Sequence, residues 1–145
     1  MTSVRDLLAT KGSEVWSVDP DMPIRGALKL MAEKEIGAVL VIENGEIIGI
    51  FSERDFARDM VAGLVYSLDT PVLMGMTHPV FYVTPEQTLE ECMALMTGKR
   101  FRHLPVLENE KLVGLVSIGD IVKQIITEKE TTIKDLEYYI WVHMI

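Results

Sequence analysis

Apolar and polar positions along the chain alternate in blocks, each with the period of a helix or of a strand. Apolar side chains in 24–31 recur every three or four positions, which predicts an amphipathic helix. Two short apolar runs within 38–52 predict strands, and Asn44-Gly45 between them favours a tight hairpin turn. An extended segment at 14–20 precedes the helix, and a closing helix is expected from about Asp55. The pattern therefore predicts the order β-α-β-β-α.

The same order of elements returns 65 residues further along the chain. Between residues 18 and 60, eleven of 43 aligned positions are identical, and the apolar positions align as well, so the chain contains a duplication. Both copies place Ser and Asp three residues apart after a Gly-bearing strand, as GIFSERD at 49–55 and GLVSIGD at 114–120. One βαββα unit is too small to bury both faces of its sheet, so the copies are expected to pack sheet to sheet.

The last helix of the second copy is expected to continue beyond the repeat. Apolar residues keep helical spacing through Ile133, Leu136 and Ile140. We therefore divide the chain into a first repeat at 1–65, a second repeat at 66–127 and a C-terminal helical extension at 128–145. The apolar stripe of the extension is expected to be buried, either against the body of the protein or against another subunit.

Composition and charge narrow the class of protein. The chain has 145 residues, 48% of them hydrophobic, and a net charge of −8, which disfavours nucleic-acid binding. Its longest apolar runs are too short to span a bilayer, and charged residues within 1–20 disfavour a signal peptide, so a cytoplasmic protein is expected. The single Cys92 is expected to be buried, and no motif predicts a metal site or a catalytic site.

With these repeats, the two Gly-apolar-apolar-Ser-x-x-Asp junctions and the strand RHLPVL at 102–107, the chain resembles a tandem pair of CBS domains. The resemblance implies an α/β (α+β) fold, in which two βαββα repeats pack through their sheets. It also implies a non-catalytic regulatory module whose clefts bind an adenosine-containing ligand such as AMP, ADP, ATP, NAD(H) or S-adenosylmethionine, without a catalytic cofactor. Such pairs usually form homodimers, and they act on a partner protein that the sequence does not identify.

The Ser-x-x-Asp spacing has two interpretations that are compatible with each other. A Ser with an acidic residue three positions later is typical of a capping box, which satisfies free backbone N–H groups at a helix start. A carboxylate beside a helix N-terminus can also accept hydrogen bonds from the two hydroxyls of a ribose. The duplication of the whole junction favours ligand binding by Asp55 and Asp120.

The resemblance implies two clefts, each combining the early part of one repeat with the Ser-x-x-Asp of the other. The residues expected in the first cleft are mostly apolar: Val15, Trp16, Ile36, Gly37, Ala38, Ser117 and Asp120. Those expected in the second include cations: Val80, Phe81, Phe101, Arg102, His103, Ser52, Arg54, Asp55 and Arg58. A phosphate-rich ligand is therefore expected to prefer the second cleft.

Simpler roles for some of these residues remain open. Arg54 and Arg58 could pair with neighbouring acidic residues, and Trp16 and Phe81 could belong to the core. Because His103 alternates with Arg102 along a strand, both cannot face one cleft directly. An adaptor protein with empty clefts is the alternative function, and a nucleotide-using enzyme with an unrecognised site is a further one.

Overall fold

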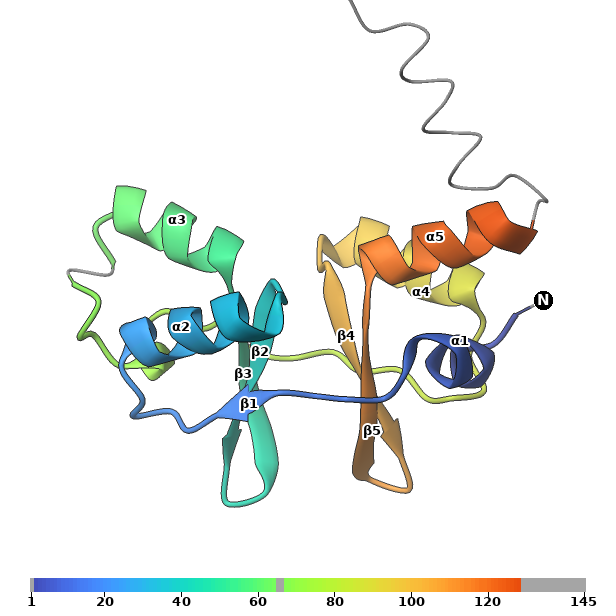
Figure 1. Ribbon diagram of the computed structural model, residues 1–145, viewed down its shortest axis with the longest axis horizontal. Coiled ribbons are helices and arrows are strands. Elements are labelled where there is room, and N and C mark those ends of the chain that lie inside the picture. The colour runs from blue at the N-terminus through green and yellow to red at the C-terminus, as the bar shows by residue number, and fades with distance from the viewer. Residues whose placement is uncertain (1, 65–66, 129–145) are drawn as a thin grey trace, which may run out of the picture. The chain divides into compact units, whose positions relative to one another are not determined.

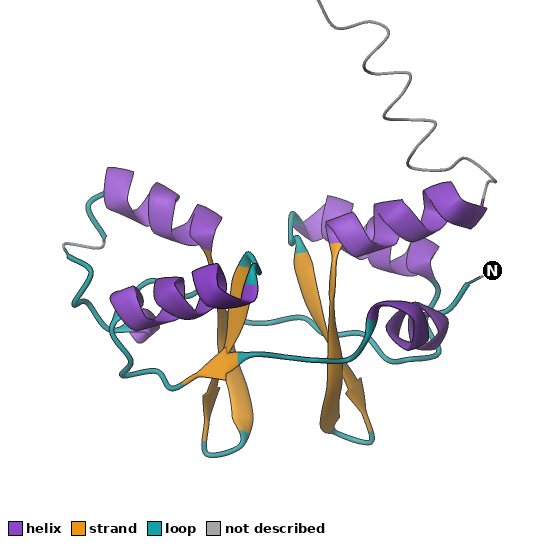
Figure 2. Cartoon of the chain, in the orientation of Figure 1, coloured by secondary structure: helices purple, strands orange, loops and turns teal. Residues whose placement is uncertain are grey.

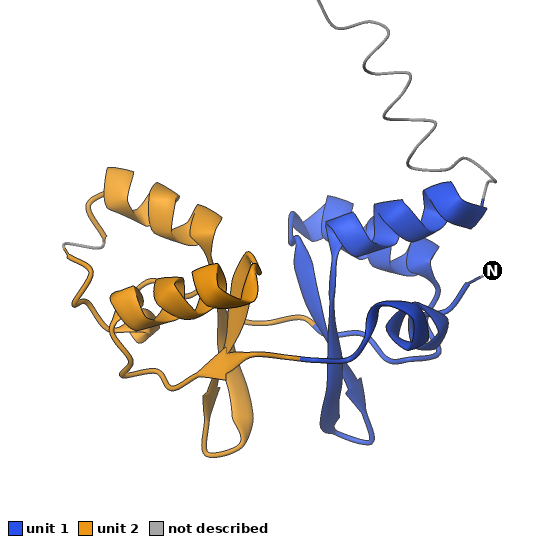
Figure 3. Ribbon diagram, in the orientation of Figure 1, with its two compact units in different colours: residues 1–14, 82–145 blue, residues 15–81 orange. Residues whose placement is uncertain are grey.

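The computed structural model describes residues 2–64 and 67–128, which form two compact units. Unit 2 is the continuous stretch Val15–Phe81. Unit 1 combines the residues up to Glu14 with those from Tyr82 onward, so the beginning of the chain belongs with the second repeat (Figure 3). The boundaries between the two units, at 14/15 and 81/82, therefore differ from the repeat boundaries at 65 and 127 that we expect from the sequence.

Unit 2 contains a three-stranded sheet with its helices on one side (Figure 1). Its elements are β1 (Ser17–Val18), α2 (Ile24–Lys34), β2 (Ala38–Glu43), β3 (Glu46–Ser52), α3 (Glu53–Val61) and a short 3-10 helix, η1 (Val72–Met74). The short strand β1 runs parallel to β2, and β2 pairs antiparallel with β3. These elements confirm the predicted order β-α-β-β-α in the first repeat.

Unit 1 has a two-stranded sheet, and its helices again cover one side (Figure 2). Its elements are α1 (Val4–Lys11), α4 (Leu89–Lys99), β4 (His103–Glu108), β5 (Lys111–Ser117) and α5 (Ile118–Glu128). The first strand expected in this repeat is reduced to a single parallel bridge between Val83 and Val106. Pro79 and Pro85 flank it, and proline lacks the N–H that a longer strand would need, which accounts for the short pairing.

Both hairpins use left-handed backbone conformations at their turns. Asn44 and Gly45 have φ angles of 51° and 80°, and their counterparts Asn109 and Glu110 have φ angles of 52° and 65°. Asn and Gly adopt these angles readily, whereas the Cβ of a glutamate makes them unfavourable. The second turn therefore keeps the geometry of the first with a less suitable residue.

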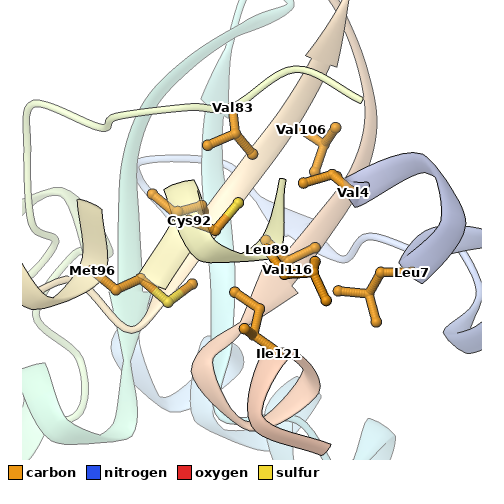
Figure 4. Close-up of a cluster of buried hydrophobic side chains, with 10 residues drawn as sticks. Val4, Leu7, Val83, Leu89, Cys92, Met96, Val106, Val116 and Ile121 are labelled. Carbon is orange, nitrogen blue, oxygen red and sulfur yellow. The ribbon is translucent and has the colours of Figure 1, made fainter. Parts of the chain in front are cut away.

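Each unit has its own buried apolar cluster beneath its helices. In unit 1 this cluster brings Val4 and Leu7 of α1 together with Cys92 and Met96 of α4 and with Ile121 of α5 (Figure 4). In unit 2, Met31 and Phe51 belong to the corresponding cluster. The burial predicted for Cys92 is confirmed, and Met31 and Met96, which occupy equivalent positions in the two repeats, are buried as well.

Helix α1 was not predicted from the sequence, and it is fastened to the second repeat. The backbone N–H groups of Val4 and Arg5 donate to the carbonyl oxygens of Gln87 and Pro85, at 2.8 and 2.9 Å. Arg5 also forms ion pairs with Glu86 and Glu108. The C-terminal helical extension at 128–145 lies, apart from Glu128, outside the described residues. Among the described residues, no helix is long and apolar enough to cross a membrane.

Candidate functional site

The two Ser-x-x-Asp junctions lie where β3 leads into α3 and where β5 leads into α5. At the first, Asp55 N donates to Ser52 Oγ at 3.1 Å, and Ser52 N donates to Asp55 Oδ2 at 3.1 Å. At the second, the same two bonds join Ser117 and Asp120, at 3.1 and 2.9 Å. Both junctions are therefore reciprocal capping boxes, as the simpler interpretation of the spacing predicts.

A capping box does not by itself distinguish a ligand site. Ser3 and Asp6 form one at the start of α1, where no Gly-bearing strand precedes them. The glycine in front of each junction has a packing role of its own. A Cβ at Gly49 would lie 2.2 Å from Met76 Sδ, and a Cβ at Gly114 would lie 2.7 Å from Leu8 Cδ2. Each glycine thus lets a side chain from another segment lie directly against the strand.

Asp55 is nearly buried, and its carboxylate is largely occupied. The residue is 7% exposed. Its Oδ1 accepts hydrogen bonds from Thr77 Oγ1 at 3.0 Å and from Arg58 Nη2 at 2.6 Å, while Oδ2 accepts the capping bond from Ser52 N. A ligand hydroxyl would use the remaining acceptor capacity of Oδ2 or replace Arg58, whose side chain is 69% exposed.

Asp120 is more accessible, and one of its oxygens is open. Its Oδ2 accepts hydrogen bonds from Ser117 N at 2.9 Å and from Lys11 Nζ at 2.8 Å, whereas Oδ1 has no partner within 2–64 and 67–128. Its side chain is 28% exposed. Burial alone would raise the pKa of Asp120, but the hydrogen bonds from Lys11 and Ser117 lower this pKa below its usual value. Asp120 is therefore an ionised acceptor at neutral pH.

The predicted aromatic residues differ in their surroundings. Trp16 is half-buried at the edge of the unit 2 cluster, and Lys34 Nζ lies 4.3 Å from the centroid of its ring. One face of the indole is thus covered by a cation, a favourable contact. Phe81 is 38% exposed and lies outside both clusters.

The basic residues predicted for the second cleft also differ in their pairing and exposure. Arg58 pairs with Asp55, as the simpler alternative for this residue supposes. Arg54 is exposed and forms no ion pair within the described part of the chain. Arg102 is exposed just before β4, and His103 is half-buried as its first residue.

Within each unit, the residues before the hairpin lie beside the junction of that same unit. In unit 2, Glu53 N donates to Gly37 O at 3.1 Å, and Ala38 is the strand partner of Ser52. In unit 1, Ile118 N donates to Arg102 O at 2.9 Å, with His103 opposite Ser117. Val15, Ile36, Val80 and Phe101 are half-buried. The two predicted clefts combine residues of both units, and they stay predictions.

Two residues that contact the junction aspartates were missed by sequence reasoning. Thr77 reaches Asp55 from the segment after η1, and Lys11 reaches Asp120 from the end of α1. Neither residue lies in a motif. Since Lys11 is 109 residues away from Asp120, no local pattern could have revealed the contact.

A duplicated hairpin-and-helix unit with a Ser-x-x-Asp helix start in each copy defines a class of tandem-repeat proteins. Comparison with known families identifies which one: the CBS domain matches residues 4–62 and again residues 71–127. The chain therefore belongs to the CBS domain family, as the resemblance predicts. It is a pair of CBS domains.

Similar proteins are small CBS proteins as well. The chain is 33% identical over 149 residues to the mitochondrial CBS domain-containing protein CBSX3 of Arabidopsis thaliana, covering 96% of this chain and 72% of that protein. It is 34% identical over 122 residues to YhcV of Bacillus subtilis, covering 83% and 84%. A putative signal-transduction protein with CBS domains from Burkholderia ambifaria superposes with a TM-score of 0.85 at 47% identity, covering 91% of this chain and 99% of that structure. The predicted mixed α/β fold is thereby confirmed.

Proposed function

We propose that this CBS pair is a non-catalytic sensor that binds an adenosine-containing ligand, with AMP, ATP and NAD(H) as the leading candidates. The observation that carries the proposal is the ionised Asp120, whose side chain is 28% exposed and whose Oδ1 has no hydrogen-bond partner among residues 2–64 and 67–128. A ribose offers two adjacent hydroxyl donors, and a carboxylate accepts from both. Asp55 would play the same part in the other site, with Arg58 giving way to the ligand.

Two solved structures of the same fold support this class of ligand. The CBS pair of MJ0100, with a TM-score of 0.77 and 18% identity, is in complex with 5'-methylthioadenosine and S-adenosyl-L-methionine. CBSX2, with a TM-score of 0.70 and 24% identity, is in complex with AMP. These complexes support adenosine as the common part of the ligand, and they leave the choice among nucleotides to experiment.

The proposed signal is a shift between arrangements of the two repeats. A ligand held by residues of both repeats stabilises the arrangement in which those residues are closest, and a partner protein would respond to that arrangement. We further propose that the protein acts in the cytoplasm as a homodimer. The exposed Ile118 and Val122 on α5 supply apolar surface for such a contact.

The alternative is an adaptor whose sites stay empty, and the occupied, buried carboxylate of Asp55 favours it. A thermal-shift panel with AMP, ADP, ATP, NAD⁺, NADH and S-adenosylmethionine separates the two functions. A ligand at a hundred times its dissociation constant adds about 2.7 kcal/mol of stability. That gain corresponds to a rise in melting temperature of roughly 5–10 °C for a domain of this size. The absence of any shift with the whole panel would support the adaptor.

Asp120→Ala and Asp55→Ala then assign the sites. If Asp120 accepts ribose hydroxyls, Asp120→Ala should abolish most of the shift while the apo protein remains folded. Asp6→Ala is the matched control, because it removes a capping-box carboxylate from α1. Ligand shifts that survive unchanged in both Asp120→Ala and Asp55→Ala would contradict the ribose role.

A further inference from the structure

Lys11 lies close enough to Asp120 to contact a ligand that binds there. Its ammonium donates to Asp120 Oδ2 at 2.8 Å and to the carbonyl oxygen of Leu115 at 2.6 Å. The side chains of Lys11 and Asp120 are equally exposed, at 28% each. The end of α1 therefore brings a positive charge to the edge of the second junction.

At the first junction, the two corresponding groups accept hydrogen bonds from the neutral Thr77, and the cation on Asp55 is the exposed Arg58 of the same helix. Shifted by 65 residues, Leu115 and Asp120 correspond to Ile50 and Asp55. There, Thr77 serves both acceptors: its backbone N–H donates to Ile50 O at 2.8 Å, and its hydroxyl donates to Asp55 Oδ1 at 3.0 Å. In unit 1, the ammonium of Lys11 takes the place of this neutral amide and hydroxyl, and it binds Oδ2 of the aspartate rather than Oδ1. The replacement distinguishes the two junctions chemically.

The ammonium retains a donor for a ligand. A lysine has three N–H donors, and the two acceptors account for two of them. In the described part of the chain the third donor has no acceptor, and since the side chain is partly exposed, this donor is available beside Oδ1 of Asp120. An anionic acceptor and a cationic donor then lie next to each other, which suits a ligand that carries a sugar hydroxyl near a phosphate oxygen.

We propose that Lys11 is a specificity-determining residue of the Asp120 site: Asp120 accepts a sugar hydroxyl while Lys11 donates to a phosphate oxygen of the same ligand. This inference rests on the proposed adenosine-binding function. It also gives the site that contains Asp120 a cation of its own, whereas the sequence pattern assigned Arg54, Arg58 and Arg102 to the other. A phosphorylated ligand then gains a cationic contact that an unphosphorylated one does not have.

The test compares AMP with adenosine by isothermal titration calorimetry on the full chain. Lys11→Met keeps the aliphatic stem and removes the charge. It should weaken AMP binding about tenfold or more, the value of a charge-assisted hydrogen bond, and change adenosine binding less than about twofold. Lys11→Arg should retain the preference for AMP.

Lys123→Met is the matched control. Lys123 lies on α5 three residues after Asp120, is exposed, and makes no side-chain hydrogen bond within the described residues. Removing it changes the net charge by the same amount, and the affinity of both ligands should stay within about twofold of wild type. A loss of AMP affinity as large as that of Lys11→Met would show a general charge effect and overturn the proposal.

The other possible results of the Lys11→Met titrations also decide whether the proposal holds. Equal losses for AMP and adenosine in Lys11→Met would mean that Lys11 only fastens α1, and tighter binding of both would mean that it competes with the ligand for Asp120. Unchanged affinities would remove it from the site. All three overturn the inference while leaving the proposed function intact. If wild type binds neither AMP nor adenosine, the inference fails, and the proposed function fails with it only when ADP, ATP, NAD⁺, NADH and S-adenosylmethionine also give no thermal shift.

Discussion

Replacing Asp55 by alanine tests whether burial or ion pairing gives the first junction its stability. The substitution removes three hydrogen bonds at once: those from Ser52 N, from Thr77 Oγ1 and from Arg58. The bond to Arg58 is the shortest, at 2.6 Å, and distance alone would make it the strongest. Solvent exposure predicts instead that this bond contributes little, because the Arg58 side chain is 69% exposed, although that of Asp55 is only 10% exposed.

The magnitudes follow from these surroundings. An exposed ion pair contributes about 0–1 kcal/mol after screening by solvent. Loss of the capping bond to Ser52 N costs about 1 kcal/mol. Loss of the bond from the half-buried Thr77 hydroxyl costs another 1 kcal/mol or so. Asp55→Ala should therefore lower the free energy of unfolding by about 2–3 kcal/mol, with little of the loss due to Arg58.

Urea unfolding followed by circular dichroism measures these terms. Thr77→Val, Arg58→Met and Asp55→Ala are prepared singly, and each of the first two is then combined with Asp55→Ala. The cycle with Thr77→Val should give a coupling free energy of about 1 kcal/mol, and the cycle with Arg58→Met less than about 0.5 kcal/mol. A larger coupling to Arg58 than to Thr77 would refute the argument from burial.

Three further predictions concern other parts of the molecule. Glu110→Gly should raise the free energy of unfolding by about 1 kcal/mol by relieving a left-handed glutamate, whereas Gly45→Ala should lower it by a similar amount in urea titrations. Asp120 has a lowered pKa in the folded state, so its contribution to stability is present above its unfolded pKa of about 3.9 and is lost as the pH falls through the lower folded value. Unfolding at pH 7 and pH 3 should therefore differ less in Asp120→Asn than in wild type, and an equal difference would contradict the lowered pKa. Burial, with smaller effects of neighbouring glutamates, raises the pKa of the Cys92 thiol to about 11. Native protein should thus react with a thiol reagent at pH 8 only as fast as it unfolds, and immediate reaction would contradict that burial.

The repeated part of the fold could be predicted because its signals are local. Helices, strands and hairpin turns depend on apolar spacing and on turn residues such as Asn44 and Gly45, and two aligned copies reinforce each other. The short extended segment expected around Val83 pairs through only one parallel bridge, because the flanking prolines lack the N–H groups that a longer strand would donate.

Helix α1 had a local signal that the repeat obscured. Ser3 and Asp6 have the spacing of a capping box, and Val4 and Leu7 have helical spacing, but no equivalent segment aligns with them in the other copy. The hydrogen-bond partners of the two aspartates could not be predicted from the sequence. Asp55 and Asp120 have the same motif, and their different partners, Thr77 and Lys11, come from segments that the motif does not include.

The division of the chain into units has a consequence for how the protein is made. Since Val4 and Leu7 of α1 complete a core that also contains Val116 and Ile121, α1 cannot pack into this core until β5 and α5 have been synthesised. Residues 15–81 form a continuous unit and can fold while the rest is still being translated. During synthesis, the unit formed by residues 15–81 should therefore fold before α1 packs against α4 and α5.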